Sequence, residues 1–360
     1  MRCLTLANAL RAQGAECLFL SREHTGHLHA AVEAHGFPLF NLGPVDARYS
    51  AVDETDYSRW LGVDVQRDVD DTLTRLTEAP VDWLVVDHYS LDRQWEQVMT
   101  PVYKRLLVID DLANREHIAD VLLDQNLSNT AAHYQSLVPN SCTLMMGPRY
   151  ALLRPEFASL RPESLVRRSK GTTQNVLVTM GGVDRDNVTS TVLDALRDCV
   201  RYVNLKVTVV MGANAPWCKQ IIAQATTMPY PIEVLVNSQH MAQLMCEADI
   251  AIGAAGSTSW ERCCMGLPTL QWVLADNQRM TAQALSALGA AYLVEPIKLV
   301  EYLCRVFTYW KENPTCLIEM SRAAAQVTDG AGTSRVVHQL LERGALCDDI
   351  DGLSLPYITG

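Results

Sequence analysis

The sequence lacks an excess of positive charge, a long apolar run and a recognisable export signal. Lysine and arginine total 30 against 41 aspartate and glutamate residues, so the formal net charge is -11. A surface of that sign repels phosphate-rich partners, which excludes nucleic acid and anionic membrane surfaces. No stretch approaches the roughly 18 apolar residues of a membrane span. The first residues also lack the basic-then-apolar plan of a signal peptide, and we therefore expect a protein that is not exported.

Cysteine and histidine are present, but not in the patterns of a disulfide framework or a metal site. The 11 cysteines include no C-x-x-C pair, and two of them, Cys263 and Cys264, are adjacent. An odd number without regular spacing is not typical of a disulfide scaffold. His24, His27 and His29 are clustered, but without the i, i+4 spacing and intervening glutamate of a zinc helix. We expect a cytoplasmic protein that uses neither a metal nor a cofactor.

The sequence does contain a regular alternation of short buried strands with longer amphipathic helices. This alternation is typical of parallel sheets covered by helices on both faces, and 360 residues are enough for two domains. Prolines and a basic, polar stretch interrupt the alternation shortly before residue 170. We predict an α/β protein with two Rossmann-like, doubly wound domains facing a cleft, over residues 1–170 and 171–344, followed by a tail over 345–360.

The chain opens on a helix, whereas an α/β domain usually opens on a strand. Leu4, Leu6, Ala7 and Leu10 fall near helical spacing, and Gly14 follows the last turn. Ligands of such domains bind at the loop between the first strand and the first helix. We therefore expect the first domain to lack its first strand, which would leave backbone groups of the neighbouring strands unpaired.

The most informative stretch is "DIAIGAAGSTSWERCCMGLPTL" at residues 249–270. A buried strand ends in the small residues 253–256, and Ser257 or Thr258 is placed to cap the next helix. The N-terminus of a helix carries roughly +0.5 charge and free amides, which can hold a diphosphate without a lysine. Glu261 has two interpretations. It caps its own helix, which is the commoner role, or it accepts two hydroxyls of a ribose.

Two further turns in the second half carry polar residues after a strand. Gly181 and Gly182 follow "NVLVTM", with Asp184 and Asn187 near the next helix start. The turn at 276–278, "DNQ", either binds sugar hydroxyl and acetamido groups or caps a helix, and its spacing does not decide between these roles.

The first half has polar residues after two of its strands. Asp87, His88 and Tyr89 follow "WLVV", and Asp110 and Asp111 follow "LLVI". Acidic pairs at strand ends can bind metals, but no third and fourth ligands stand at a matching interval. His88 is the histidine that we keep as a candidate functional residue.

Several segments, taken together and in order, resemble one enzyme family over residues 1 to about 295. They are "MRCLTLA", "DHYSLDRQWE", "VIDDLANREHIADVLLDQN", "YALLRPEF", "TMGGVDRDN", "GAAGSTSWERCCMGLP" and "DNQ". The family is that of the UDP-2,4-diacetamido-2,4,6-trideoxy-β-L-altropyranose hydrolases of the pseudaminic acid pathway. The resemblance implies the two-domain GT-B glycosyltransferase fold. It also implies metal-free attack of water on the anomeric carbon, with inversion and release of UDP, on the route to the sugar that decorates flagellin.

The resemblance also implies roles for individual residues. Asn187 and Glu261 match the family's substrate-binding Asn and Glu, which favours ribose binding over capping for Glu261. Backbone amides of the two small-residue turns would hold the diphosphate, and they belong to Gly181, Gly182, Gly256, Ser257 and Thr258. Three other side chains resemble groups that line the sugar pocket, namely Tyr89, Asn277 and Gln278.

The family's catalytic base has no counterpart in the sequence. In the family a strand and a G-x-G-H loop, whose histidine is the proton acceptor, precede the segment that matches "MRCLTLA". His27 follows the second strand and is not equivalent, so the catalytic residue stays unassigned. We expect a start upstream of Met1 or, as the alternative, a chain that binds UDP-sugars without hydrolysing them. A GT-B glycosyltransferase that uses a UDP-amino sugar is a further alternative, and in each case we expect a monomer or a weak dimer.

Overall fold

A computed structural model describes residues 1–49, 56–76, 80–200, 203–294, 299–345 and 357–359, which form two compact units. Unit 1 comprises Met1–Leu152 and Gly332–Gly360, and unit 2 comprises Leu153–Ala331. The junction therefore lies at Leu152 and not near residue 170. The reason is that the proline-containing stretch is a helix, α6 (Pro155–Arg168), which buries Phe157 and Ser164 and packs against helices that belong to unit 2. None of the described helices is both long and apolar enough to cross a bilayer.

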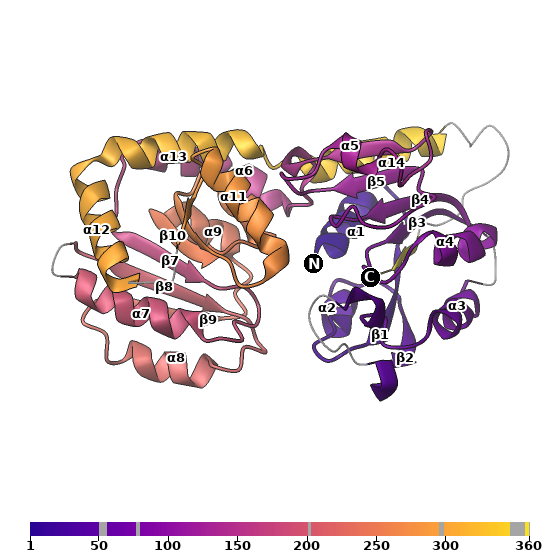
Figure 1. Cartoon of the computed structure of the whole chain (residues 1–360), viewed down its shortest axis with the longest axis horizontal. Coiled ribbons are helices and arrows are strands. Elements are labelled where there is room, and N and C mark those ends of the chain that lie inside the picture. The colour runs from indigo at the N-terminus through magenta and orange to yellow at the C-terminus, as the bar shows by residue number, and fades with distance from the viewer. Residues whose placement is uncertain (50–55, 77–79, 201–202, 295–298, 346–356, 360) are drawn as a thin grey trace. The chain divides into compact units, whose positions relative to one another are not determined.

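Unit 2 is a six-stranded parallel sheet in the order β12-β11-β10-β7-β8-β9, of which Figure 1 labels β7 to β10. The chain builds one half outward from β7 through β8 to β9, then returns to the other side of β7 with β10. Its strands are β7 (Asn175–Thr179), β8 (Lys206–Met211), β9 (Ile232–Val236), β10 (Ile250–Ala254), β11 (Thr269–Trp272) and β12 (Tyr292–Leu293). The strand order thus reverses between β7 and β10, and this is the position where doubly wound sheets bind ligands.

The helices of unit 2 cover both faces of this sheet, as its strands require. Strand β10 is buried along its whole length, and so is β7 apart from its first residue, because helices lie on either side of the sheet. Besides α6, the helices are α7 (Val188–Cys199), α8 (Cys218–Ala225), α9 (Met241–Glu247), α10 (Thr258–Cys264), α11 (Arg279–Ala287), α12 (Leu299–Glu312), α13 (Pro314–Val327) and the 3₁₀ turn η5 (Asp276–Gln278).

Unit 1 is a seven-stranded parallel sheet in the order β2-β1-β13-β3-β4-β5-β6. Its strands are β1 (Leu18–Glu23), β2 (Leu39–Pro44), β3 (Val81–Val86), β4 (Tyr103–Ile109), β5 (Val121–Asp124), β6 (Thr143–Met146) and β13 (Tyr357–Thr359). Its α-helices are α1 (Arg2–Arg11), α2 (His29–Ala34), α3 (Val65–Leu73), α4 (Arg93–Met99), α5 (Ala131–Tyr134) and α14 (Gly332–Ala345). Its 3₁₀ turns are η1 (Ala47–Tyr49), η2 (Tyr57–Arg59), η3 (Thr100–Val102) and η4 (Pro148–Tyr150).

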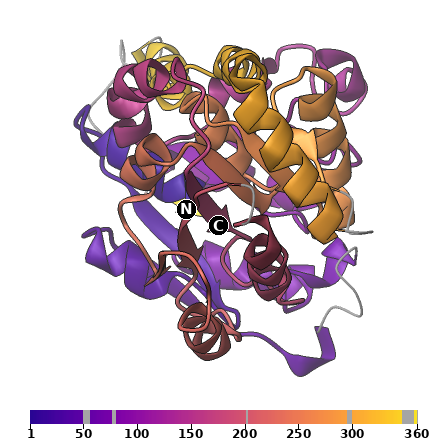
Figure 2. The ribbon, with the colours of Figure 1, turned by 90° about the vertical axis from the view of Figure 1, so that its left-hand side faces the viewer.

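The last strand of the chain fills the centre of the unit 1 sheet. Tyr357 lies opposite Leu18 of β1 on one side and opposite Leu84 of β3 on the other, with both pairings parallel. This is the place that the first strand of a doubly wound sheet takes. The expectation that β1 and β3 would be left unpaired is therefore wrong for the described chain, and β13 ends close to the start of α1 (Figures 1 and 2).

The C-terminal segment therefore differs from the tail predicted over 345–360. Residues 357–359 form a strand of the sheet, whereas 346–356 and 360 lie outside the described residues. A three-residue strand is too short to show a period of two, and its partners lie far away in the sequence. Helix α14, which precedes it, returns to unit 1 because its buried Val336, Val337 and Leu340 join the core formed with α1.

Candidate functional site

Two glycine-containing loops leave the unit 2 sheet side by side, where the strand order reverses. Strands β7 and β10 pair in parallel, with Thr179 opposite Gly253 near the carboxyl end of each strand. The loop after β7 contains Gly181 and Gly182, and the loop after β10 contains Gly256. The structure therefore brings all five residues predicted to hold a diphosphate to one edge of one sheet, and we call this edge, with residues 180–187 and 255–261, the switch-point edge.

Backbone packing fixes the loop after β7. A Cβ atom added to Gly212, which follows β8, would lie 2.0 Å from the carbonyl oxygen of Gly182. Gly182 itself has open space where a side chain would stand, and Gly181 has a φ of 81°. The loop therefore rests on Gly212 on one side while its other side stays open to a ligand.

Asp184 has a structural role in this loop. Its two carboxylate oxygens accept hydrogen bonds from the amides of Val188 at 2.9 Å and Thr189 at 3.0 Å. These amides belong to the first turn of α7, so the chain itself caps this helix. The carboxylate of Asp184 is thereby occupied and does not face a ligand.

Asn187 occupies the position before α7 in a left-handed backbone conformation, with φ 53° and ψ 41°. Its side chain does not cap the helix. Its Oδ1 atom is buried and has no hydrogen-bond partner in the described part of the chain. An unmet buried acceptor destabilises a fold by about 1–3 kcal/mol, so this oxygen is well suited to accept a hydrogen bond from a ligand.

The hydroxyls of Ser257 and Thr258 do not cap α10, contrary to the prediction for that pair. Ser257 stands at the N-cap position without a capping hydrogen bond from its side chain, which is exposed. The Thr258 hydroxyl accepts a hydrogen bond of 3.1 Å from the Arg262 Nη1. The Thr258 hydroxyl is thus already hydrogen-bonded to Arg262. What Ser257 and Thr258 offer a ligand is their backbone.

Glu261 does not cap its helix either. Its carboxylate makes no hydrogen bond or ion pair with any of the described residues, although it lies in the first turn of α10 and is only partly exposed. Burial raises the pKa of Glu261 to about 7, and the nearby Arg154 and Arg262 offset this rise only in part. A half-buried carboxylate without a partner is free to accept hydrogen bonds from a ligand.

The turn η5 brings one of its two predicted residues to the switch-point edge. The Gln278 Nε2 lies 3.7 Å from the place where a Cβ of Gly256 would stand, and its Oε1 accepts a hydrogen bond from the Leu274 amide at 3.0 Å. The side chain of Gln278 is therefore held beside the glycine loop. Asn277 is exposed on the same turn.

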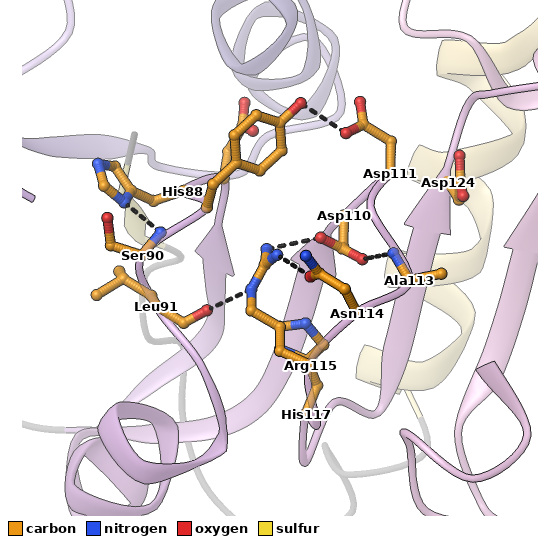
Figure 3. Close-up of polar contacts among 12 residues, drawn as sticks. His88, Ser90, Leu91, Asp110, Asp111, Ala113, Asn114, Arg115, His117 and Asp124 are labelled. Carbon is orange, nitrogen blue, oxygen red and sulfur yellow. Dashed lines mark hydrogen bonds and ion pairs between the residues drawn. The ribbon is translucent and has the colours of Figure 1, made fainter. Parts of the chain in front are cut away.

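Unit 1 carries a second polar cluster, at the carboxyl ends of β3 and β4 (Figure 3). The Tyr89 hydroxyl donates to Asp111 at 2.5 Å, and the Arg2 guanidinium pairs with Asp87 at 2.6 Å. Arg2 also approaches Asp111 to within 3.5 Å. Sequence reasoning identified the tyrosine and the acidic residues here, but it missed Arg2, because nothing in "MRCLTLA" shows where its side chain points.

His88 is held as a neutral ring in this cluster. Its Nδ1 accepts a hydrogen bond of 3.1 Å from the Ser90 amide (Figure 3). Burial lowers the pKa of His88 to about 4, with His24 adding to this effect. At neutral pH the ring is therefore uncharged, and the nitrogen that could take a proton stabilises the turn after β3.

A buried acidic network lies behind the same edge of the unit 1 sheet. The Tyr134 hydroxyl donates to Asp124 at 2.8 Å, and Asn129 donates to the same carboxylate at 2.7 Å. Burial raises the pKa of Asp124 to about 6 despite these donors. Asp110 is fully buried and pairs with Arg115 at 2.6 Å. Both carboxylates are therefore bound by side chains of unit 1, and their role at this edge is structural.

One protein-family model matches the second half of the chain. The sequence profile of the glycosyltransferase family 28 C-terminal domain matches residues 175–334. The chain is 25% identical over 215 residues to an uncharacterized protein of Methanocaldococcus jannaschii, and the match covers 59% of this chain and 44% of that protein. It is 25% identical over 205 residues to the spore coat polysaccharide biosynthesis protein SpsG of Bacillus subtilis, and the match covers 55% of this chain and 58% of that protein. The chain thus spans about half the length of these relatives.

A third relative belongs to the family named from the sequence. The chain is 24% identical over 217 residues to the UDP-2,4-diacetamido-2,4,6-trideoxy-beta-L-altropyranose hydrolase of Campylobacter jejuni, and the match covers 59% of this chain and 74% of that protein. This likeness is distant. It supports the GT-B superfamily and leaves the particular hydrolase family a proposal.

Solved structures establish the fold over nearly the whole chain. MurG of Acinetobacter baumannii has a TM-score of 0.63 at 17% identity, with 95% of each chain covered. TcCGT1 in complex with UDP has a TM-score of 0.62 at 14% identity, with 96% of each chain covered. The UDP-GlcNAc 2-epimerase of Neisseria meningitidis, bound to UDP-GlcNAc, has a TM-score of 0.59 at 11% identity, with 95% of this chain and 96% of that chain covered. The predicted GT-B fold, which is a nucleotide-sugar-related fold, is confirmed.

Proposed function

We propose that this protein is an enzyme that binds a UDP-sugar at the switch-point edge of unit 2 and releases UDP. The observation that carries the proposal is the pair of unpartnered acceptors there, the Asn187 Oδ1 and the Glu261 carboxylate, beside two glycine loops. Polar groups of this kind are normally satisfied inside a protein, so their openness points to a ligand that donates hydrogen bonds. The relatives that were solved with UDP or UDP-GlcNAc support the same ligand class.

The proposed binding mode follows the chemistry of the loops. The backbone amides of Gly181, Gly182, Gly256, Ser257 and Thr258 would hold the diphosphate, since loops with little side-chain bulk let an anion approach the chain. The Glu261 carboxylate would accept the two ribose hydroxyls, and Gln278 and Asn277 would contact the sugar. Diphosphate is a good leaving group, so the chemistry requires chiefly positioning and stabilisation of the departing charge.

The specific reaction that we propose is hydrolysis of a UDP-linked 2,4-diacetamido-2,4,6-trideoxy sugar. Water attacks the anomeric carbon, the bond from that carbon to the diphosphate oxygen breaks, and the free sugar leaves with inverted configuration. The distant likeness to the Campylobacter jejuni hydrolase supports this substrate. No residue is assigned as the base, because burial lowers the pKa of His88 to about 4 and its Nδ1 already accepts a hydrogen bond from the Ser90 amide.

A second candidate is a glycosyltransferase that moves the sugar to an alcohol. The match of residues 175–334 to the glycosyltransferase family 28 C-terminal domain favours it. Binding of the nucleotide is the same in both reactions, so the two differ only in the nucleophile. A protein that binds UDP-sugars without turnover is the third possibility.

One experiment separates these three functions. The purified chain is incubated with the diacetamido UDP-sugar, and the anomeric proton is followed by NMR with and without added alcohol acceptors. Inverted free sugar and UDP without an acceptor support the hydrolase, and acceptor-dependent UDP release supports the transferase. Calorimetry with UDP is run alongside. Absence of UDP binding would overturn the proposal altogether, and binding without turnover would leave only the nucleotide-binding part.

A further inference from the structure

Arg262 is a buried cation that has the charge of Glu261 nearby but forms no ion pair with a described residue. Its side chain is 1% exposed. Its Nη2 donates to the Ala254 carbonyl at 2.7 Å and to the Ser259 hydroxyl at 3.0 Å, and its Nη1 donates to the Thr258 hydroxyl at 3.1 Å. Its Nε has no hydrogen-bond partner, and no carboxylate among the described residues forms an ion pair with it. Burial lowers the pKa of Arg262 to about 10, so the guanidinium still carries its charge at neutral pH.

The charge of Arg262 lies directly beneath the switch-point edge. A Cβ atom on Gly253 would stand 2.8 Å from the Arg262 Nη1 and 2.8 Å from the Thr179 carbonyl oxygen. Gly253 and Thr179 are paired residues near the ends of β10 and β7. The guanidinium therefore packs against Gly253, which lies near the end of β10 and pairs with Thr179 of β7, and Gly253 is needed to make room for it.

The hydrogen bonds of Arg262 do not by themselves require a charge. Neutral donors could satisfy two hydroxyls and one carbonyl, whereas burying a charge without a direct ion pair is costly. Arg168 offers the comparison within the same unit. It is also buried, donates to the main-chain carbonyls of Met245 and Ala248, and has one carboxylate charge nearby, that of Asp249, as Arg262 has that of Glu261. Arg168 differs in lying at the opposite end of β10.

We propose that Arg262 is a positioning residue that holds the glycine loop after β10 and supplies the fixed positive charge that favours a diphosphate over an uncharged ligand at the switch-point edge. This inference rests on the proposed function. The hydrogen-bond donors of Arg262 already engage the loop, so it acts on the ligand through the loop and through its field and does not touch the phosphates. In a poorly solvated place such a field is screened much less than at a surface.

The test compares a charged ligand with an uncharged one that shares its base and ribose. Calorimetry measures the dissociation constant of UDP, and competition against UDP measures that of uridine. In Arg262→Gln we expect UDP affinity to fall about 10-fold or more, and uridine affinity to fall much less. In Arg262→Lys, which keeps the charge, we expect much of the preference for UDP over uridine to return. Arg168→Gln is the matched control, and it should leave this preference as in the unmodified chain.

Each outcome decides a separate point. If the unmodified chain does not bind UDP, the proposed function fails and not this inference alone. If UDP binds normally but both ligands weaken equally in Arg262→Gln, or neither weakens, Arg262 has no electrostatic role and the inference is overturned. If Arg262→Gln does not fold, the comparison is made in Arg262→Met, which also removes the charge but places an apolar side chain in the buried site. There too, a loss confined to UDP supports the inference and equal losses overturn it.

Discussion

The Arg2 guanidinium holds the Asp87 carboxylate through two hydrogen bonds, of 2.6 Å and 3.0 Å, and so fastens the start of α1 to the carboxyl end of β3. The Cys3 thiol donates to the same carboxylate at 3.0 Å. Burial acts to raise the pKa of Asp87, but Arg2 and Cys3 outweigh it and lower that pKa. The beginning of the described chain is thereby anchored to the edge of the unit 1 sheet.

Breaking this pair is expected to destabilise unit 1. Arg2→Met leaves the Asp87 carboxylate partly buried without its cation, which should lower the free energy of unfolding by about 1–2 kcal/mol. Because the pKa of Asp87 is lowered in the folded protein, the stabilisation by this pair also depends on pH. The stabilisation is present above the pKa of the unfolded carboxyl and is lost as the pH falls through the lower folded value.

Urea denaturation of Arg2→Met and of the unmodified chain, at neutral and acidic pH, measures this effect. Arg93→Met is the matched control, because Arg93 and Glu116 form a pair of 2.8 Å that is about half exposed on both sides, at 52% and 56%. That control should change stability by about 0.5 kcal/mol or less. Equal losses of unfolding free energy in the two variants would show that the Arg2–Asp87 pair stabilises the protein no more than an exposed pair does.

Glu261 should make the stability of unit 2 fall as the pH rises. Burial raises its folded pKa to about 7, above the ordinary value, so the protonated form is the one that suits the folded state. The stability linked to this group is complete below the unfolded pKa and is lost as the pH rises through the folded pKa. Glu261→Gln removes the titration, so we expect it to be more stable than the unmodified chain at pH 8, by about 1–3 kcal/mol, and similar at pH 4.5.

Glu261→Gln should bind UDP more weakly than the unmodified chain at the same high pH values at which it is more stable. Since an ionised carboxylate accepts hydrogen bonds from both ribose hydroxyls, UDP affinity of the unmodified chain should rise relative to that of Glu261→Gln between pH 6 and 8. Calorimetry at several pH values measures this difference. Glu247→Gln, at the exposed last residue of α9, serves as the control and should follow the unmodified chain. If the ratio of the UDP affinities of the unmodified chain and Glu261→Gln stays constant across this pH range, Glu261 does not bind the nucleotide.

Asn187 should be dispensable for folding and needed for binding. Its Oδ1 has no partner and its φ is 53°, so Asn187→Gly removes an unmet acceptor at a position where glycine fits without strain. We expect a change in unfolding free energy below about 1 kcal/mol, with UDP affinity lowered about 3- to 10-fold. Asn237→Gly is the matched control, because Asn237 has nearly the same conformation, φ 54°, after the edge strand β9. Equal affinities in both variants would contradict a role for Asn187.

Gly212 and Gly182 should respond to alanine in opposite ways. A Cβ on Gly212 would meet the Gly182 carbonyl oxygen at 2.0 Å, whereas Gly182 has no atom within 4 Å of its own Cβ position. Gly212→Ala must displace backbone, so we expect it to destabilise unit 2 by about 2 kcal/mol or more. Gly182→Ala should keep the melting temperature and weaken UDP binding, because the methyl group occupies the open side of the loop. A stable Gly212→Ala would show that the loop can shift.

The sequence predicted those features that depend on local pattern. Alternating strands and helices gave the two doubly wound units, and glycines after strands located the switch-point edge. The resemblance singled out Asn187 and Glu261, whose binding roles stay predictions, but the sequence did not show that Asp184 would cap α7. A buried arginine looks the same in sequence as an exposed one, so Arg262 was missed. Its role depends on packing against Gly253, which lies on another element.

The centre of the unit 1 sheet could not be predicted, because β13 acquires its structure only from its partners. Residues 357–359 pair with β1 on one side and with β3 on the other, in the register Ile358 to Phe19 and Ile358 to Val85. Such pairing over a long sequence distance follows from the backbone groups that need partners and not from local propensity.

Removal of β13 should therefore expose the interior of the sheet to exchange with solvent. In a chain that lacks residues 357–360, backbone groups of β1 and β3 lose their partners, so their amides should exchange about 10-fold faster or more. Hydrogen exchange with mass spectrometry measures this in peptides that span Leu18–Leu20 and Leu84–Val86. Ile358→Pro keeps the length of the chain but disrupts the strand, and it should show the same increase. Peptides from β7 and β10 provide the internal control, since unit 2 has its own sheet. Unchanged protection of β1 and β3 in both variants would mean that another segment covers them in solution, and the position of β13 would then be wrong.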